Sequence, residues 1–226
     1  GYSQPGQTTQ GIHFRLWSRA FIVVDQETEK RVIMATTDMG ILPQGVSQAV
    51  LRKLAAKYGG LYHERNVLLS ATHTHSGPGG YSHYALYNLA MSGFSKQNFD
   101  VVVDGIFQSI VRAHANLSPG TLHLAKGELH DASVNRSKQA YARNPERERA
   151  VYPPSGVDAD MSVLSFLRRD GRAAGVMAWF PVHGTSMKQK NHLISGDNKG
   201  VASYLFEKWR GADYGDKSAF VAAFPN

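Results

Sequence analysis

The sequence Asn66-Val67-Leu68-Leu69-Ser70-Ala71-Thr72-His73-Thr74-His75-Ser76-Gly77-Pro78-Gly79-Gly80 runs from an apolar segment into a glycine-rich turn that contains two histidines. The first six residues are typical of a buried β-strand, and the final five cannot continue a sheet. Because side chains alternate along a strand, His73 and His75 are predicted to point to one side, about 7 Å apart. Open α/β sheets bind ligands at the carboxyl ends of their strands. The pair therefore indicates either a zinc site or, alternatively, two surface histidines in a turn.

The segments on the N-terminal side predict a parallel unit that leads into this strand. Residues 20–25 and 31–38 are expected to be strands joined by a polar turn, which favours a hairpin. A helix is expected over residues 43–58, because Val46, Val50 and Leu54 recur every four residues and a glycine pair follows Tyr58. Strand, helix and strand in this order predict a parallel unit.

The C-terminal half continues the alternation of helices and strands. The pattern predicts helices over residues 96–115 and 198–210, and strands over 121–125, 161–167, 175–180 and 218–224. The second of these helices is expected to begin at Ser195 or Asp197 as N-cap and to bury Val201, Tyr204, Leu205 and Trp209. The polar stretch 131–160 is too long for a simple connection and is expected to line a site. The prediction is one α/β domain with a mixed β-sheet flanked by helices and a metal site at the carboxyl ends of its strands.

A third histidine follows an apolar strand at Trp179-Phe180-Pro181-Val182-His183-Gly184. Taken alone, His183 is most simply interpreted as a histidine that is hydrogen-bonded at the end of a strand. Two strand-end histidines, His73 and His183, can however meet over one edge of a sheet and bind a single zinc ion.

Other polar residues give weaker signals. His192 lies in the loop after His183, and Asp38 ends a strand at what could be the same edge, where it could orient a histidine or simply close a turn. The remaining histidines lack partners at ligand spacing and are expected to be surface or packing residues: His13, His63, His83, His114, His123 and His130.

Composition limits the possible protein classes. The chain has 226 residues, of which 42% are hydrophobic and 19% charged, as in ordinary globular proteins. No apolar run approaches the roughly 18 residues of a transmembrane helix. There is no cysteine, so any zinc must be bound by histidine, carboxylate or tyrosine oxygen. The chain opens on Gly1-Tyr2-Ser3 without an initiator methionine, so the sequence does not indicate a compartment.

The formal net charge of +7 does not indicate a nucleic-acid-binding protein. Lysines and arginines are scattered, and no ladder of aromatic and basic residues is present. A solvated basic surface is the simpler interpretation, with attraction to an anionic membrane surface as the functional alternative.

Several motifs together resemble the neutral ceramidase family. They are Gly1-Tyr2-Ser3, Gly11-Ile12-His13-Phe14-Arg15, Ser18-Arg19-Ala20-Phe21, the run from Ala71 to Gly80, Asn135-Arg136-Ser137, Trp179 to His183 with Thr185-Ser186-Met187, and Asn191-His192-Leu193 leading to Asp197-Asn198-Lys199-Gly200. The resemblance extends in order over almost the whole chain.

The resemblance implies a zinc amidase that cleaves the N-acyl bond of ceramide, releasing sphingosine and a fatty acid. By position, His73 and His183 would be zinc ligands, and His75 and Arg136 would be catalytic residues that contact the scissile amide or a substrate hydroxyl. Gly1 falls where the family has a glycine near the substrate head. The resemblance also implies a secreted or cell-surface protein that meets ceramide at a membrane or micelle surface.

The family is longer than this chain. Its other zinc ligands, a glutamate and a tyrosine, and a serine with an assigned catalytic role lie downstream. After the position of Phe224 the family continues through a segment that ends Gly-Asp-x-Ser-Pro-Asn. Here Phe224 is followed at once by Pro225-Asn226, and the chain opens without a methionine, so we expect a chain truncated at both ends. Residues 1–226 would then be an incomplete N-terminal part of the catalytic domain, inactive by itself and completed by the missing downstream part of the same chain.

Two alternatives from other classes remain open at this point. One is a different zinc hydrolase that uses His73 and His75 as a strand-borne ligand pair. The other is a non-catalytic lipid-binding protein of the same fold.

Overall fold

The computed structural model describes residues 3–151, 155–216 and 219–226, and its strands form separate sheets of two, three and four strands. The predicted mixture of helices and strands is confirmed, but the expectation of a single mixed sheet is wrong. The hairpin near residue 170 pairs with strands before and after it in the chain and, within the described residues, makes no ladder with the N-terminal strands. The three-stranded and four-stranded sheets are therefore separate and stack on one another.

The first sheet has the order β2-β3-β4. β2 (Ser18–Val24) and β3 (Arg31–Thr37) form the expected antiparallel hairpin. β4 (Val67–Ala71) pairs with β3 in parallel, and α1 (Gln44–Tyr58) makes the crossover between them. The predicted strand, helix and strand are thus confirmed, and β3 and β4 end at the same edge.

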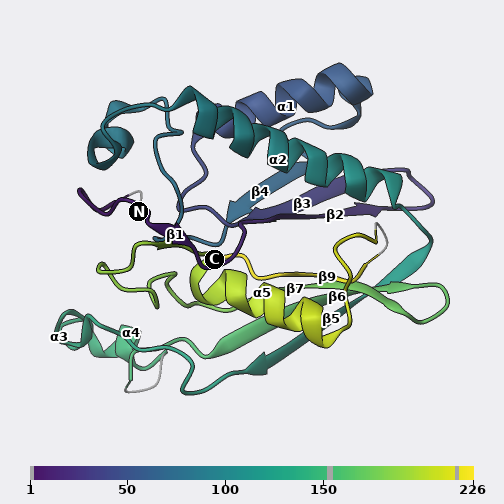
Figure 1. The fold of residues 1–226 in the computed structure, drawn as a ribbon. Coiled ribbons are helices and arrows are strands. Elements are labelled where there is room, and N and C mark those ends of the chain that lie inside the picture. The colour runs from purple at the N-terminus through teal and green to yellow at the C-terminus, as the bar shows by residue number, and fades with distance from the viewer. Residues whose placement is uncertain (1–2, 152–154, 217–218) are drawn as a thin grey trace.

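Helices α1 and α2 (Lys96–Ala115) cover one face of this sheet, above it in Figure 1. Val46, Val50 and Leu54 are fully buried, as their spacing predicts. Ile106 and Ile110 of α2 are buried in the same cluster. This packing fixes the position of β3 and β4, whose carboxyl ends lead into the site.

The second sheet has the order β5-β6-β7-β9. Its members are β5 (Gly120–Glu128), β6 (Asp160–Arg168), β7 (Ala173–Trp179) and β9 (Val221–Ala223). The first three pair antiparallel, and β9 joins β7 in parallel. The expected strands are present, although Ser218, the first residue of the last predicted one, lies outside the described residues.

The two sheets pack against each other through their inner faces (Figure 1). Phe21 of β2 stacks on Phe166 of β6 with ring centroids 4.3 Å apart. Met177 and Ala223 are buried in the same cluster. Such apolar contact between sheets removes both inner faces from water and holds β4 and β7 in a fixed relation.

Helix α5 (Asp197–Trp209) packs beside β9, but its buried face differs from the prediction. Leu205 and Trp209 are 55% and 73% exposed. The helix instead buries Lys199, Ser203 and Glu207, so its expected apolar face was wrong. Polar side chains can be buried there because each charged one has partners.

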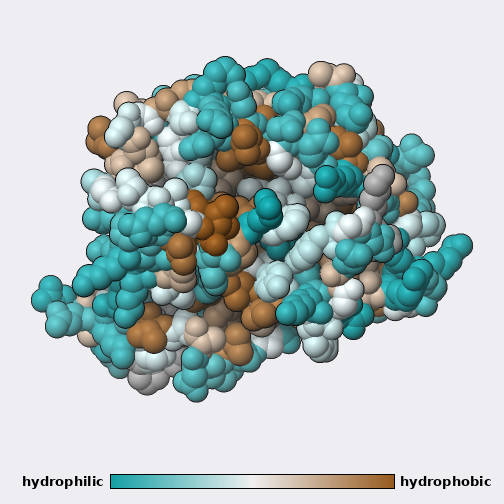
Figure 2. Space-filling model, in the orientation of Figure 1, coloured by the Kyte–Doolittle hydropathy of each residue, from teal (hydrophilic) through white to brown (hydrophobic). Residues whose placement is uncertain are grey.

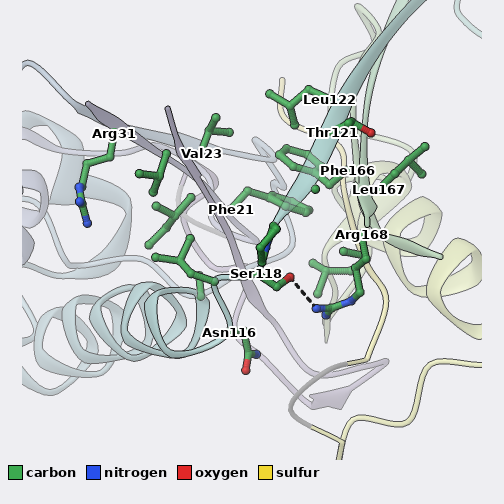
Figure 3. Close-up of a pocket in the computed structure, with 18 of the residues that line it drawn as sticks. Phe21, Val23, Arg31, Asn116, Ser118, Thr121, Leu122, Phe166, Leu167 and Arg168 are labelled. Atoms are coloured by element: carbon green, nitrogen blue, oxygen red, sulfur yellow. Dashed lines mark hydrogen bonds between the residues drawn. The ribbon is translucent and has the colours of Figure 1, made fainter. Parts of the chain in front are cut away.

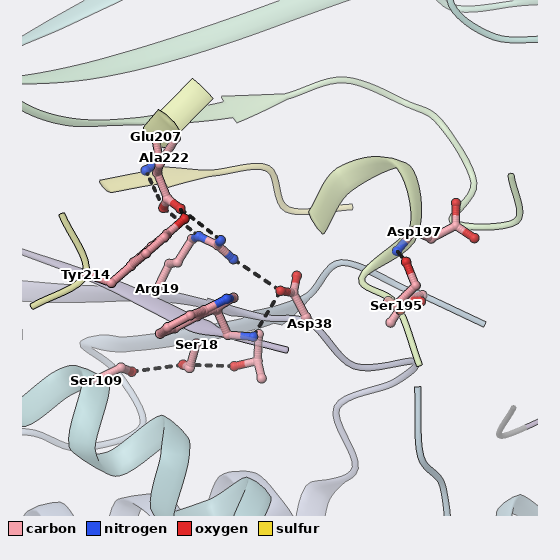
Figure 4. A network of polar contacts seen from close by, with 12 residues as sticks. Ser18, Arg19, Asp38, Ser109, Ser195, Asp197, Glu207, Tyr214 and Ala222 are labelled. Carbon is pink, nitrogen blue, oxygen red and sulfur yellow. Dashed lines mark hydrogen bonds and ion pairs between the residues drawn. The ribbon is translucent and has the colours of Figure 1, made fainter. Parts of the chain in front are cut away.

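The partner of Glu207 is Arg19 of β2 (Figure 4). The Arg19 guanidinium donates from Nε to Glu207 at 2.7 Å and from Nη1 to Asp38 at 3.2 Å. Glu207 also accepts from the backbone N–H of Ala222 and from the Tyr214 hydroxyl. This buried network joins β2, the end of β3, α5 and β9.

The other elements are short. β1 (Gly11–Ile12) pairs in parallel with β8 (Leu193–Ile194). The remaining turns of helix are η1 (Gly59–Leu61), η2 (Ala85–Met91), α3 (Lys138–Tyr141) and α4 (Glu146–Arg149). Within the described ranges, no helix is both long and apolar enough to cross a bilayer.

Candidate metal centre

Three histidines meet beyond the carboxyl ends of β4 and β7. The Nε2 atom of His75 lies 3.4 Å from Nε2 of His73 and 3.0 Å from Nε2 of His183. One ring nitrogen of each residue lies within 4.8 Å of the other two. Nitrogens bound tetrahedrally to one zinc ion at 2.0–2.1 Å would be about 3.3 Å apart. The spacing and chemistry of this cluster therefore fit a zinc ion.

The backbone at His73 explains why the rings converge. β4 ends at Ala71, and His73 has φ +61°, a left-handed conformation that few residues other than glycine adopt. The chain therefore leaves the extended path at the first histidine. The His73 and His75 ring centroids are 4.9 Å apart, and the predicted strand-like separation of about 7 Å is wrong.

The carbonyl group of Gly40 orients the ring of His73. Its oxygen lies 2.6 Å from Nδ1 of His73. A carbonyl can only accept, so Nδ1 holds the hydrogen and Nε2 presents a lone pair toward the other histidines. The sequence interpretation missed Gly40 and considered Asp38, two residues earlier. Asp38 instead accepts from the backbone of Trp17 and from Arg19.

Gly184 permits the close approach of the two histidine-bearing loops. A Cβ atom at this position would lie 2.3 Å from the carbonyl oxygen of His73, which no side chain allows. The Gly184 carbonyl accepts from the backbone N–H of His75 at 3.1 Å. The cluster therefore requires a glycine after His183, and the presence of Gly184 at this position can be read from the sequence.

The first turn of α5 holds the loop that presents His183. The Asp197 carboxylate accepts from the backbone N–H groups of Ser186 and Met187 at 2.9 and 3.0 Å. The amide of Asn198 donates to the carbonyl oxygen of His183 at 2.8 Å. Neither expected N-cap is the one observed, since Gly196 occupies that position, but Asp197 at the first turn fixes the loop instead.

Lys199 extends this support to the strand before the loop. Its buried ammonium donates to the carbonyl oxygen of Phe180 and, at 2.8 Å, to that of Pro225. Burial lowers the pKa of Lys199 to about 8. The lysine thus joins Phe180, the residue after β7 and three residues before His183, to the segment after β9.

The histidine loop is also tied to the segment that contains β8. Thr74 donates through its hydroxyl to the Ser195 carbonyl at 2.6 Å, and the Ser195 N–H donates to the Ser76 carbonyl at 2.9 Å. Both bonds join residues more than a hundred positions apart in the sequence. They hold the backbone on either side of His75.

The environment of the cluster favours neutral imidazoles. Desolvation by burial lowers the pKa of His75 to about 4, with further lowering by His73, His183 and Arg136. Desolvation and the charges of His73 and Arg136 likewise lower the pKa of His183. A neutral imidazole has the lone pair that a metal requires, so both residues are in the ligating form near neutral pH.

Arg136 lies in the polar stretch 131–160, on an exposed segment, and its charge acts on both His75 and His183. The structure thus brings this stretch toward the histidines. Gly1, the remaining predicted site residue, lies outside the described residues.

The other histidines are apart from the cluster. In the described part of the chain, His73, His75 and His183 are the only group with metal-ligand spacing. His192 instead donates from Nδ1 to the Thr8 carbonyl at 2.7 Å. Hence His192 is not brought to the centre by the fold.

A cavity of about 760 Å³ opens between the two sheets at the opposite end of β2 and β3 (Figure 3). Apolar side chains, including Phe21, Leu122 and Phe166, line it, and Arg168 donates to Ser118 at its edge. It includes none of the three clustered histidines, so the candidate centre is a separate feature.

Comparisons with known proteins match this chain to ceramidases. The sequence model described as neutral/alkaline non-lysosomal ceramidase, N-terminal, matches residues 1–226. A neutral ceramidase of Pseudomonas aeruginosa is 51% identical over 224 residues, which cover 99% of this chain and 32% of that protein. A neutral ceramidase of Mycobacterium tuberculosis is 46% identical, with 99% of this chain and 36% of that protein covered.

Solved structures show the same fold. The crystal structure of the neutral ceramidase from Pseudomonas aeruginosa superposes with a TM-score of 0.91 at 50% identity, over 99% of this chain and 34% of that one. A ceramidase complexed with C2 gives a TM-score of 0.90 at 50% identity and the same coverage. The chain thus spans about a third of the length of these relatives.

Proposed function

The chain belongs to the neutral/alkaline non-lysosomal ceramidase family, and from this premise we propose that residues 1–226 form the N-terminal part of the catalytic domain of a zinc-dependent amidohydrolase. The substrate is ceramide, whose N-acyl amide bond is hydrolysed to give sphingosine and a fatty acid. The rest of a longer chain would complete the site.

The observation that supports this proposal most strongly is the convergence of His73, His75 and His183. When bound, zinc supplies a Lewis acid that polarises a carbonyl and lowers the pKa of a coordinated water. His73 and His183 would bind it through Nε2. Two protein ligands are fewer than catalytic zinc sites use, so this assignment needs further ligands from elsewhere.

His75 and Arg136 would act on the substrate. Arg136 is always charged and can donate to the oxygen of the amide carbonyl as negative charge develops there. His75 is neutral near pH 7 because its pKa is about 4, so it can accept a hydrogen bond from the amide or a substrate hydroxyl. Gly1 would lie near the substrate head.

A second assignment of His75 follows from its distances. Its Nε2 lies at ligand spacing from both neighbours, which favours a three-histidine site in which His73 and His75 bind the same ion. This is the arrangement expected of a different zinc hydrolase. Zinc content of a His75→Ala variant separates the two assignments.

Ceramide is a membrane lipid, so the proposed enzyme meets its substrate at a membrane or micelle surface, and we place it outside the cell or at the cell surface. A non-catalytic lipid-binding protein would share the fold but would bind ceramide without metal.

The direct test uses the full-length protein with ceramide as substrate. We expect hydrolysis that a chelator abolishes and that added zinc restores, with sphingosine and fatty acid in equal amounts. Ceramide binding that survives metal removal, with no hydrolysis under any metal condition, would support the lipid-binding alternative instead.

A further inference from the structure

A closed loop with an exposed apolar tip follows the histidine turn directly. Its neck is formed by the backbone N–H of Ser95, which donates to the Gly80 carbonyl at 2.6 Å. Between these residues the chain makes the helix η2. The tip exposes large apolar and aromatic side chains: Tyr84 53%, Leu86 73%, Tyr87 53%, Leu89 74% and Phe94 45%.

Internal contacts hold this loop in shape and join it to the metal centre. Buried Asn88 donates to the Ser82 carbonyl at 2.5 Å. The hydroxyl of buried Tyr81 accepts from the N–H of Gly40 at 3.2 Å. Gly40 is also the residue whose carbonyl orients His73, so one peptide segment supports both the loop and a candidate ligand.

The segments around the centre have an unusual charge distribution. The histidine turn and apolar loop, residues 72–95, contain no Asp, Glu, Lys or Arg. The other two segments, 132–143 and 181–196, contain no Asp or Glu, and the exposed Glu146 and Glu148 follow the first of them on α4 together with Arg147 and Arg149. The two segments do contain five exposed cations: Arg136, Lys138, Arg143, Lys188 and Lys190.

These segments are neighbours in space. Residues 72–95 and 181–196 are joined by the bond from His75 to Gly184, and Arg136 acts on both His75 and His183. Figure 2 shows apolar surface at the upper left, where Figure 1 draws the short teal helix before α2. The edge that holds the histidines therefore has an apolar tip and a cationic border.

From this combination we infer that the histidine-bearing face docks on an anionic lipid–water interface, with the loop 80–95 inserted among the lipids. Transfer of leucine side chains from water into lipid is favourable in free energy, and tyrosines favour the headgroup region, where the hydroxyl end of the ring contacts water. Each nearby lysine or arginine adds attraction to anionic lipids. The inference rests on the proposed action on a membrane lipid, because docking by this face would place the centre at the surface where ceramide lies.

The chemistry distinguishes this partner from others. A nucleic acid would not favour the exposed leucines, since its binding sites combine cations with stacking aromatics. A second copy of this chain would bring the same five cations toward one another. An apolar tip on the same edge as exposed cations fits an anionic bilayer best.

The first experiment measures binding of the full-length protein to vesicles by sedimentation. The vesicles are phosphatidylcholine alone or with phosphatidylglycerol. We expect binding to the anionic vesicles, weakened by salt, and at least about a tenfold loss of partitioning in the Leu86→Ser/Leu89→Ser variant. The matched control is Leu124→Ser/Leu205→Ser, which removes leucines that are 65% and 55% exposed on β5 and α5. It should bind as the unchanged protein does.

The second experiment compares two ceramide substrates. The Leu86→Ser/Leu89→Ser variant should keep its kcat/KM on a short-chain ceramide dissolved as monomers and lose about tenfold on long-chain ceramide in vesicles. If the protein binds vesicles as expected but hydrolyses neither substrate, the proposed function is refuted while the docking inference stands.

Three results would overturn the inference. One is equal vesicle binding by the loop and control variants. Another is a change of oligomeric state in the loop variant alone, seen by ultracentrifugation, which would assign the loop to contact between copies. The last is failure of a maleimide reagent to label Leu86→Cys in the full-length protein, which would show that another part of the chain covers the loop.

Discussion

The Nδ1 nitrogen of His73 lies 2.6 Å from the carbonyl oxygen of Gly40, while its Nε2 faces His75. This contact fixes both the orientation and the tautomer of the ring before any metal arrives. Because Gly40 follows β3 and His73 follows β4, the parallel pairing of these two strands creates the contact. The first sheet thus determines which nitrogen of His73 is available to a ligand.

The first prediction concerns the roles of His75 and Arg136. Full-length His75→Ala and Arg136→Ala should keep zinc content and thermal stability but lose about 10²–10³ in turnover, or roughly 3–4 kcal/mol of transition-state stabilisation. The measurement is zinc stoichiometry alongside ceramide kinetics on the same preparations. Arg169→Ala, an exposed arginine at the far end of β6, serves as the control.

A metal-free His75→Ala variant would identify His75 as a ligand and favour the three-histidine arrangement. Normal turnover in both variants would remove the proposed catalytic roles and leave only the metal site.

The second prediction concerns Asp197. Replacing it with alanine removes the acceptor of the Ser186 and Met187 N–H groups, and each lost partner costs about 1–3 kcal/mol. We expect a lower free energy of unfolding and weaker zinc binding, because the His183 loop loses its support. Chemical denaturation and zinc titration measure these two effects. Asp213→Ala, which removes an exposed acceptor of the Gly215 N–H, should change neither.

The third prediction concerns the pH dependence that Lys199 contributes. Its pKa in the folded protein is about 8, below the ordinary value of 10.5, because burial disfavours the ammonium. Between pH 8 and 10.5 the unfolded chain retains a proton that the folded protein has released, so raising the pH favours folding. Below pH 8 Lys199 is charged in both states, and the full free-energy cost of burying its charge lowers the stability of the folded protein.

Denaturation of Lys199→Met and the unchanged protein across this range provides the test. The free energy of unfolding of the unchanged protein should rise relative to the variant from pH 8 to 10.5. A difference that is independent of pH in this window would show that Lys199 keeps its ordinary pKa.

The fourth prediction concerns the buried pair of Arg19 and Glu207. Arg19→Met would leave Glu207 and Asp38 buried without their cationic partner, which costs about 3–5 kcal/mol. Thermal and chemical unfolding measure this loss. The exposed pair of Arg172 and Asp170 offers a matched comparison, and Arg172→Met should leave stability almost unchanged. Equal effects of the two variants would contradict a structural role for the buried network.

Hydrophobic periodicity predicted the helices and strands well where each of them buries a single apolar face. Val46, Val50 and Leu54 occupy one face of α1 and are buried as expected, while Tyr58, the next residue of this series, is partly buried. The stacking of two sheets was not predicted, since both one mixed sheet and two packed sheets require the same apolar strands. Helix α5 was misjudged because its buried face is polar, and the partners of Glu207 and Lys199 lie far away in the sequence.

The meeting of two of the clustered histidines could be predicted, but the geometry of the cluster could not. Strand-end position suggested that His73 and His183 could meet, and the structure brings them together. The left-handed backbone of His73 and the carbonyl of Gly40 had no sequence signal strong enough to use. Gly184 did have one, because a glycine directly after a strand-end histidine suggests a close backbone approach.

The zinc stoichiometry of full-length His73→Ala and His183→Ala, measured with ceramide hydrolysis on the same samples, tests whether these two histidines hold the catalytic metal. Both variants should lose zinc and activity together, because each leaves the ion short of a ligand. Far-UV circular dichroism should confirm that they remain folded, and His123→Ala, an exposed histidine on β5, should behave as the unchanged protein. Retention of one zinc per chain by folded His183→Ala would contradict the claim that His73 and His183 hold the catalytic metal.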